Sequence, residues 1–273
     1  QALLGAMTDA ARRFASEKWA GYQIFVVDAT AVTRPGAPGT TARVHYALRL
    51  CDLYPVQADV TDDKGGETLR RFVAHAGPGQ LWIGDRGYAN PPGISALVAR
   101  GADVMVRYNR GSLPLFDLED RRIDLCARLG DLEPGAANEW TVCIHPRNQQ
   151  PIRGRIVALR LPADKAQEAR ARLRREQGKN VSAETLELAE FVVVFTTVLP
   201  SVLSTEVVLE LYQLRWQVEL SIKRDKSIAG LDRLPNFRPD TIRAWILTKM
   251  LLVQIAHKIS TAEVCVPPCA AAA

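Results

Sequence analysis

The segment Tyr212–Lys226, YQLRWQVELSIKRDK, has the periodicity of an amphipathic helix. At about 100° per residue, polar side chains gather within roughly 80° of the helical wheel, namely Tyr212, Arg215, Glu219, Lys223 and Lys226. An apolar stripe that can pack on a sheet lies about a quarter-turn away and consists of Leu211, Leu214, Val218 and Ile222. Taken alone, the polar face is also typical of a solvated helix with a Glu219–Lys223 ion pair.

Two aspartates follow apolar, strand-like runs elsewhere in the chain. Asp28 comes directly after Ile24–Val27, and Asp85 ends the run in LWIGDRGY. A buried carboxylate is costly unless it is paired, metal-bound or solvated, although either residue alone could simply end a strand or form a turn. Three converging carboxylates would offer the oxygen ligands that hard divalent cations prefer, and two such cations support phosphodiester chemistry.

The spacing of four of these residues resembles a family signature. Tyr212, Arg215, Glu219 and Lys226 follow Y-(2)-R-(3)-E-(6)-K, which is similar to the signature of DDE transposases of the insertion-sequence-four family. The DRGY sequence after Gly84 resembles the form usual around the family's second carboxylate, and TDDKGGETL resembles the polar stretch before it. The resemblance extends from about residue 22 to about residue 255.

The chain departs from the family pattern at two places. Ala29 and Thr30 follow the first aspartate, where Gly or Ser is often found, and Ile222 stands where an aromatic residue is usual. We expect the second departure to affect packing more than chemistry.

The resemblance implies a ribonuclease-H-like α/β fold, a mixed sheet with flanking helices, interrupted by a mainly β insertion. It also implies that two Mg²⁺ or Mn²⁺ ions are held by the catalytic carboxylates Asp28, Asp85 and Glu219. The expected activity is cut-and-paste DNA transposition, with flanking DNA released through a hairpin. The expected partners are double-stranded DNA, as transposon ends and target, and a second copy in a synaptic homodimer. The predicted DNA-phosphate contacts are Tyr212, Arg215 and Lys226, with Lys223 and Trp216 as weaker candidates.

The rest of the chain predicts an alternating α/β order. Strands are expected at residues 23–27, 44–51, 81–85, 104–108, 141–145, 153–161 and 191–197. Helices are expected at 1–20, 68–75, 91–100, 163–177, from Ser204 or Thr205 through Glu219, and 239–260. The predicted domains are 1–106, the first part of the core; 107–190, the insertion; 191–262, the second part; and 263–273, a tail. The arginines of 163–177 suit a solvated face better than a DNA contact.

Composition sets broad limits. The chain has 273 residues, of which 47% are hydrophobic, enough for a real core. It lacks an apolar run of roughly 20 residues and a signal-peptide pattern, which favours a cytoplasmic, nucleoid-associated bacterial protein. The net charge of +5 is compatible with a nucleic-acid partner without being diagnostic. The five cysteines contain no C-x2-C pair, which favours reduced thiols over a zinc site.

Alternatives remain open from the sequence. Trp216 could stack a displaced base, but a core tryptophan is favoured, and His45 is expected to be structural. For the whole chain, the alternatives are another nuclease on the same core, a truncated or inactive remnant that only binds DNA, and a metal-dependent phosphatase. The Tyr-Arg-Glu-Lys spacing argues against the first, and the arginine-rich helix makes the last less natural.

Overall fold

The computed structural model describes residues 19–178, 181–235 and 238–263. Its strands belong to one mixed sheet of eight strands, in the order β3-β2-β1-β4-β5-β8-β7-β6. The strands are β1 (Gln23–Val32), β2 (Ala42–Arg49), β3 (Tyr54–Thr61), β4 (Gln80–Gly84), β5 (Asp103–Arg107), β6 (Ala137–Ile144), β7 (Ile152–Arg160) and β8 (Phe191–Thr196). This confirms the predicted mixed α/β sheet, and it is consistent with a ribonuclease-H-like fold.

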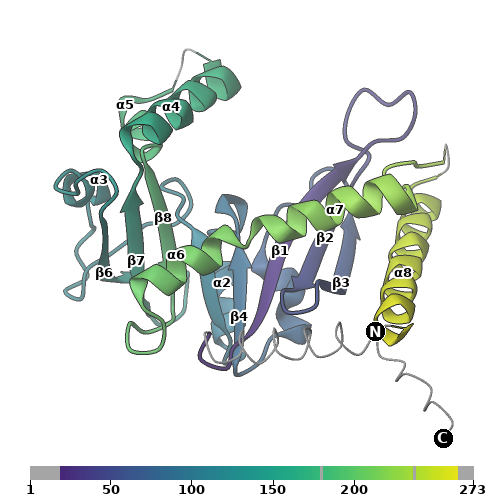
Figure 1. Cartoon of the computed structure of the whole chain (residues 1–273), viewed down its shortest axis with the longest axis horizontal. Helices are drawn as coiled ribbons and strands as arrows, with labels where there is room; N and C mark the ends of the chain where they lie inside the picture. Colours follow the sequence, from purple (N-terminus) through teal and green to yellow (C-terminus); the bar gives the residue numbers. More distant parts are fainter. Residues whose placement is uncertain (1–18, 179–180, 236–237, 264–273) are drawn as a thin grey trace, which may run out of the picture. The chain divides into compact units, whose positions relative to one another are not determined.

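Helices connect and flank these strands (Figure 1). The α-helices are α2 (Pro91–Val98), α3 (Leu125–Leu129), α4 (Ala163–Gln177), α5 (Ala183–Leu188), α6 (Thr205–Gln213), α7 (Trp216–Ala229) and α8 (Pro239–Glu263). Two 3₁₀ segments, η1 (Leu69–His75) and η2 (Arg86–Tyr88), flank β4. Among the described residues, no helix combines the length and the apolarity needed to cross a membrane.

The chain divides into two compact units. Of the described residues, the first comprises 19–67, 74–83, 215–235 and 238–263. The second comprises residues 68–73 and 84–214. The predicted insertion, 107–190, contributes β6, β7 and the helices α3, α4 and α5 within the second unit. The predicted domain boundaries themselves stay a prediction.

In the first unit, β1 pairs antiparallel with β2 and parallel with β4, while β3 pairs antiparallel with β2. The central apolar runs are buried, as their lack of alternation predicts: Val26, Val27, Ala47 and Leu48 are each 0% exposed. Helix α7 packs on β1 and β2, and α8 packs on β3 (Figure 1). The unit is therefore a sheet with the Glu219 helix on one face.

In the second unit, β5, β8, β7 and β6 form an antiparallel succession. Helix α4 has the predicted bounds, and two of its arginines form ion pairs: Arg172 with exposed Glu176 at 3.6 Å and Arg170 with the largely buried Glu190 at 2.8 Å. These pairs agree with the interpretation of a solvated face.

Several elements differ from the sequence prediction, among them the short helices α3 and α5, which were not predicted. Strand β1 continues to Val32, so Asp28 lies inside the strand, because β2 pairs with β1 as far as Val32 opposite Ala42. Strand β3 was not predicted; its Pro55 sits beside a register shift at Ala47/Leu48, one of the places where a strand tolerates proline. The segment Leu69–His75 is a 3₁₀ rather than an α-helix.

The single helix predicted from Ser204 through Glu219 is also wrong, because the structure has two helices there. Helix α6 ends at Gln213 and α7 begins at Trp216, although Leu214 and Arg215 keep right-handed helical backbone angles. The predicted start is confirmed: the Ser204 hydroxyl caps α6 by accepting from the backbone N–H of Val207. The helix predicted at 1–20 and the predicted tail fall almost wholly outside the described residues.

Candidate active site

Asp28 lies on the face of the sheet that α7 covers. In the β1–β2 register Asp28 stands directly opposite Tyr46, and cross-strand partners project from the same face. The Tyr46 hydroxyl donates to Asp225 of α7 at 2.7 Å, which identifies this face. Asp28 itself is half-buried, and its Oδ1 accepts from the backbone N–H of Ala29 at 2.8 Å.

Glu219 lies on the flank of α7 that turns toward β1. The helix buries Val218, Ile222 and Asp225 against the sheet. Lys226, seven residues after Glu219 and so about 20° away on the helix, donates to the backbone oxygen of Ala31 in β1 at 3.3 Å. The side chain of Glu219 is 41% exposed, which leaves it accessible at this flank.

A cation already contacts the Glu219 carboxylate. Arg215, at the start of α7, pairs with Glu219 at 2.5 Å, and the Arg215 side chain is only 19% exposed. The alternative interpretation from the sequence paired Glu219 with Lys223, four residues later, whereas the ion pair of Glu219 in this structure is with Arg215. Lys223 is exposed to solvent. The signature arginine and glutamate are therefore direct neighbours.

Asp85 follows the last residue of β4. Its Oδ1 accepts from the backbone N–H of Gly87 at 2.8 Å, so it also caps the short helix η2. In the parallel pairing of β1 with β4, Val26 stands beside Ile83. Asp28 comes two residues after Val26, and Asp85 comes two residues after Ile83.

Gly84 is required immediately before Asp85. A Cβ at this position would come within 2.8 Å of the Tyr88 Cβ, closer than real Cβ contacts allow. Tyr88 is fully buried, so it cannot move aside easily. The DRGY turn thus packs back on the end of β4.

The predicted site residues are divided between the two units. Asp28, Arg215, Glu219, Lys223 and Lys226 belong to the first unit, and Asp85 and Tyr212 to the second. Within the part of the chain that the structure describes, no group of three or more His, Cys, Asp or Glu residues could hold a metal ion. The ligand set Asp28, Asp85 and Glu219 therefore stays a prediction.

Two further residues were interpreted from the sequence. Trp216 is 49% exposed, so the expectation of a core tryptophan is wrong; it lies about 200° around α7 from buried Val218. His45 is fully buried with its Nε2 at 3.1 Å from the Thr61 hydroxyl, which confirms a structural histidine.

Tyr46 and Asp225 form a buried pair that was not predicted from the sequence. Tyr46 is 1% exposed and Asp225 is 6% exposed. Burial raises the pKa of the Asp225 carboxyl above its usual value, and it also raises the pKa of the Tyr46 hydroxyl, with the neighbouring Asp225 charge adding to that rise. A signal existed: Asp225 continues the apolar stripe of Val218 and Ile222 at helical spacing.

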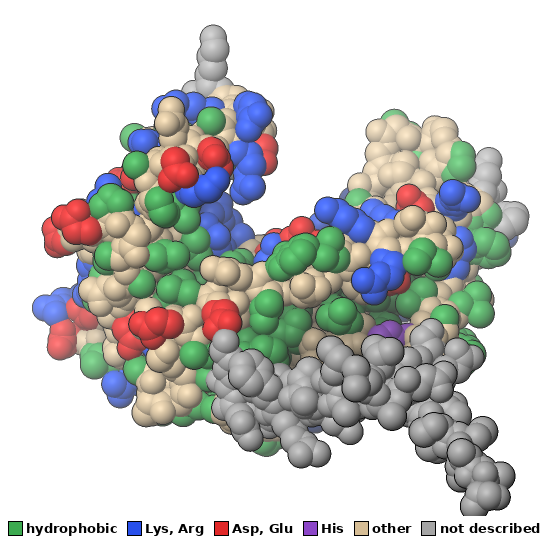
Figure 2. Space-filling model, viewed as in Figure 1, with side chains coloured by type: hydrophobic (Ala, Val, Ile, Leu, Met, Phe, Trp, Pro, Cys, Tyr) green, Lys and Arg blue, Asp and Glu red, His purple; other side chains and the backbone are tan. Residues whose placement is uncertain are grey.

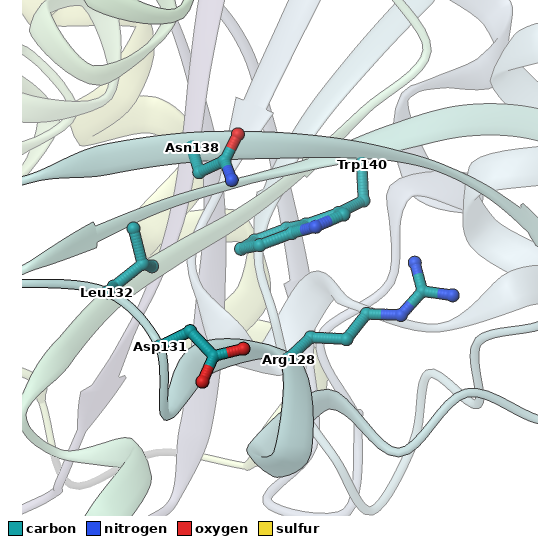
Figure 3. A pocket seen from close by; sticks show the side chains of 5 residues that line it. All are labelled: Arg128, Asp131, Leu132, Asn138 and Trp140. Atoms are coloured by element: carbon teal, nitrogen blue, oxygen red, sulfur yellow. The ribbon is translucent and has the colours of Figure 1, made fainter.

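Basic side chains lie over α7 and α4 (Figure 2). A separate pocket of about 230 Å³ lies in the second unit. Asn138 and Trp140 of β6 line it together with Arg128, Asp131 and Leu132 from α3 and the turn after it (Figure 3). It contains none of the predicted site residues, and it is smaller than typical small-molecule sites.

Comparison with known proteins identifies the class to which this fold and these residues belong. The family described as "Transposase DDE domain" matches residues 19–255, and the chain belongs to this family. Its relatives include the transposase of insertion sequence element IS421 from Escherichia coli, 33% identical over 276 residues, covering 97% of this chain and 73% of the relative. The InsL protein of element IS186A from Escherichia coli (strain K12) is also 33% identical, covering 97% of this chain and 74% of the relative.

Proposed function

We propose that this chain is the catalytic domain of a cut-and-paste DNA transposase of the insertion-sequence-four group. Membership of the transposase DDE domain family supports the class of reaction. The Tyr-Arg-Glu-Lys spacing supports the subgroup. The main structural support for the proposed site comes from the β1–β2 register and the contacts of α7. Asp28 lies on the sheet face under α7, and the flank of α7 that bears Glu219 faces β1.

In this proposal, Asp28, Asp85 and Glu219 hold two Mg²⁺ or Mn²⁺ ions. Carboxylate oxygens are the donors that these cations prefer. The Glu219 side chain is accessible, and its carboxylate would exchange the Arg215 guanidinium that now contacts it for the ions, which requires Asp28, Asp85 and Glu219 to be brought together. When bound, the ions would lower the pKa of a coordinated water and neutralise charge on the phosphate.

The reaction proceeds in four steps: nicking, hairpin formation, hairpin opening and strand transfer. Water attacks the phosphorus at a transposon end, and the 3′ oxygen leaves as a free hydroxyl. That hydroxyl loses its proton and attacks a phosphodiester of the opposite strand, which forms a hairpin and expels the 3′ oxygen of the flanking DNA. Water then attacks the hairpin phosphorus and regenerates the free 3′-hydroxyl. This hydroxyl attacks a target phosphodiester, and the target's 3′ oxygen leaves. The three carboxylates hold the reacting centre in place, and no side chain becomes covalently attached to DNA.

The basic residues of the signature suit DNA phosphates. Arg215 can form two parallel hydrogen bonds to a phosphate, whereas Lys223 and Lys226 act as point charges. Tyr212 contributes a hydroxyl near the start of the same segment, and exposed Trp216 offers an aromatic face for an unpaired base. We infer a synaptic homodimer that holds two transposon ends.

The substitution Glu219→Gln tests this function. We expect it to abolish Mn²⁺-dependent nicking of supercoiled plasmid DNA while leaving DNA binding in a gel-shift assay largely intact, because it removes one ligand charge and no basic residue. Glu206→Gln, an exposed glutamate in the first turn of α6, is the matched control and should nick at the wild-type rate. Full activity in Glu219→Gln would reject the assignment. Wild-type DNA binding without nicking would favour an inactive remnant.

A further inference from the structure

A buried polar pair connects α7 to the strand beside Asp28. The Tyr46 hydroxyl of β2 donates to Asp225 Oδ2 of α7 at 2.7 Å, and the two side chains are 1% and 6% exposed as residues. Tyr46 is the cross-strand partner of Asp28, and Asp225 immediately precedes the signature lysine, Lys226. This buried hydrogen bond thus links the strand pair that carries Asp28 to the helix that carries Glu219, and the more exposed Lys226–Ala31 hydrogen bond is a second link between α7 and β1.

We propose that Tyr46 and Asp225 are positioning residues that set where α7 lies along β1 and β2, and so where Glu219 and Lys226 stand relative to Asp28. This inference rests on the proposed function. Neither residue contacts the reacting groups in this account. They act through the position of the helix.

Stability alone gives a poor reason for a carboxylate at this position. Burial raises the pKa of Asp225, so the charged form is disfavoured here. An apolar residue would continue the stripe of Val218 and Ile222 and would avoid the cost of removing a carboxylate from water. The hydrogen bond between Tyr46 and Asp225 instead fixes the position of α7 on the sheet, because a hydrogen bond weakens steeply as its distance and angle depart from ideal values.

The apolar contacts of α7 cannot fix its position along the sheet by themselves. Hydrophobic burial is non-directional, so the stripe would tolerate a small slide of the helix along the sheet. A slide by one residue would move Glu219 by about 1.5 Å along the helix axis. A misplacement of about 1 Å in a catalytic group can cost about 100-fold in rate. The buried Tyr46–Asp225 hydrogen bond opposes a slide that packing would allow, and it is better shielded from water than the Lys226–Ala31 hydrogen bond.

The test replaces both partners by apolar groups of similar shape. In the double variant Tyr46→Phe/Asp225→Leu the buried carboxylate and its donor are removed together, and only the nearby buried Ser221 hydroxyl loses a partner, so we expect a urea unfolding midpoint close to the wild-type value. We also expect Mn²⁺-dependent nicking of supercoiled plasmid to slow by about 100-fold. Asp225→Asn keeps an acceptor for the Tyr46 hydroxyl and should nick within about threefold of wild type.

Two controls separate position from stability. Val106→Ala, in the buried part of β5 in the second unit, lowers stability without changing Tyr46 or Asp225 and should leave the nicking rate unchanged at a temperature where the protein stays folded. Tyr46→Phe alone removes a single hydroxyl, and it replaces the double variant in the nicking test if the double variant does not fold. It should slow nicking to a similar extent.

The outcomes are distinct. A double variant that is stable and nicks at the wild-type rate overturns the proposal, as does an Asp225→Asn variant that is as slow as the double variant. If wild type does not nick, the proposed function fails, and the positioning role is then judged from a crystal structure of the double variant. There, displacement of α7 with loss of the Lys226–Ala31 hydrogen bond supports the role, and an unmoved α7 rejects it.

Discussion

Arg155 is the buried charge on which the start of α6 depends. It lies on β7 with its side chain 3% exposed. Its Nε donates to the backbone oxygen of Val198 at 2.9 Å, and its other nitrogens donate to the backbone oxygen of Leu203 and to Glu139. Glu139 in turn accepts from the Thr205 hydroxyl at 2.5 Å. One guanidinium thus fixes both ends of the β8–α6 loop.

We predict that Arg155→Met lowers the free energy of unfolding by about 3–5 kcal/mol, the usual cost of removing one partner of a buried ion pair. The loss has two parts: two loop carbonyls lose their donors, and Glu139 keeps its charge without its arginine. For a chain of this size the loss corresponds to a fall in Tm of roughly 10 °C.

Urea denaturation followed by circular dichroism measures this effect. Arg153→Met is the matched control, because Arg153 is on the same strand but exposed, and it should change stability by less than about 0.5 kcal/mol. Adding Glu139→Leu to Arg155→Met should recover part of the loss by removing the unpaired charge. A loss below about 1 kcal/mol in Arg155→Met would refute the role given to this ion pair.

Two further predictions concern the candidate site. Gly84→Ala should lower the free energy of unfolding by about 1–3 kcal/mol and slow nicking, because the added Cβ would collide with buried Tyr88, close to Asp85 in the chain. Urea denaturation and plasmid nicking measure the two effects. An unchanged stability would contradict the close packing of Gly84 on Tyr88. Burial raises the pKa of Asp225 above its ordinary value of 3.8, so its favourable contribution to stability is present below about pH 3.8 and is lost as the pH rises through the raised value. Wild type should therefore lose stability relative to Asp225→Asn between about pH 4 and neutral pH, and a difference that stays constant across urea titrations at several pH values would contradict the raised pKa.

The sequence predicted most elements because their signals are local. The apolar run before Asp28 has no alternation, as expected for a strand buried on both faces, and it forms the buried part of β1. The Ser204 cap and the bounds of α4 follow from cap chemistry and helical composition. Strand β3 was missed because Pro55 and a weak apolar pattern conceal an edge strand whose partner is needed to define it.

Tertiary contacts explain the rest. No Gly or Pro stands between Gln213 and Trp216, so the sequence carries no signal for the interruption between α6 and α7. The exposure of Trp216 follows from which side of α7 meets the sheet, and that is decided by Val218 and Asp225. The pairing of Asp225 with Tyr46 joins residues 179 positions apart, which no local pattern reveals. The predicted carboxylates came instead from motif spacing and resemblance.

The central claim is that Asp28, Asp85 and Glu219 form one metal site. The most direct test is Mn²⁺ binding to wild type and Asp28→Asn, measured by calorimetry and by anomalous scattering from crystals soaked in Mn²⁺ with bound duplex DNA. We expect Mn²⁺ between Asp28 and Asp85 with Glu219 facing it, and loss of that binding in Asp28→Asn. Three carboxylates that remain far apart in the DNA-bound crystal, or Mn²⁺ binding that is unchanged in Asp28→Asn, would contradict it.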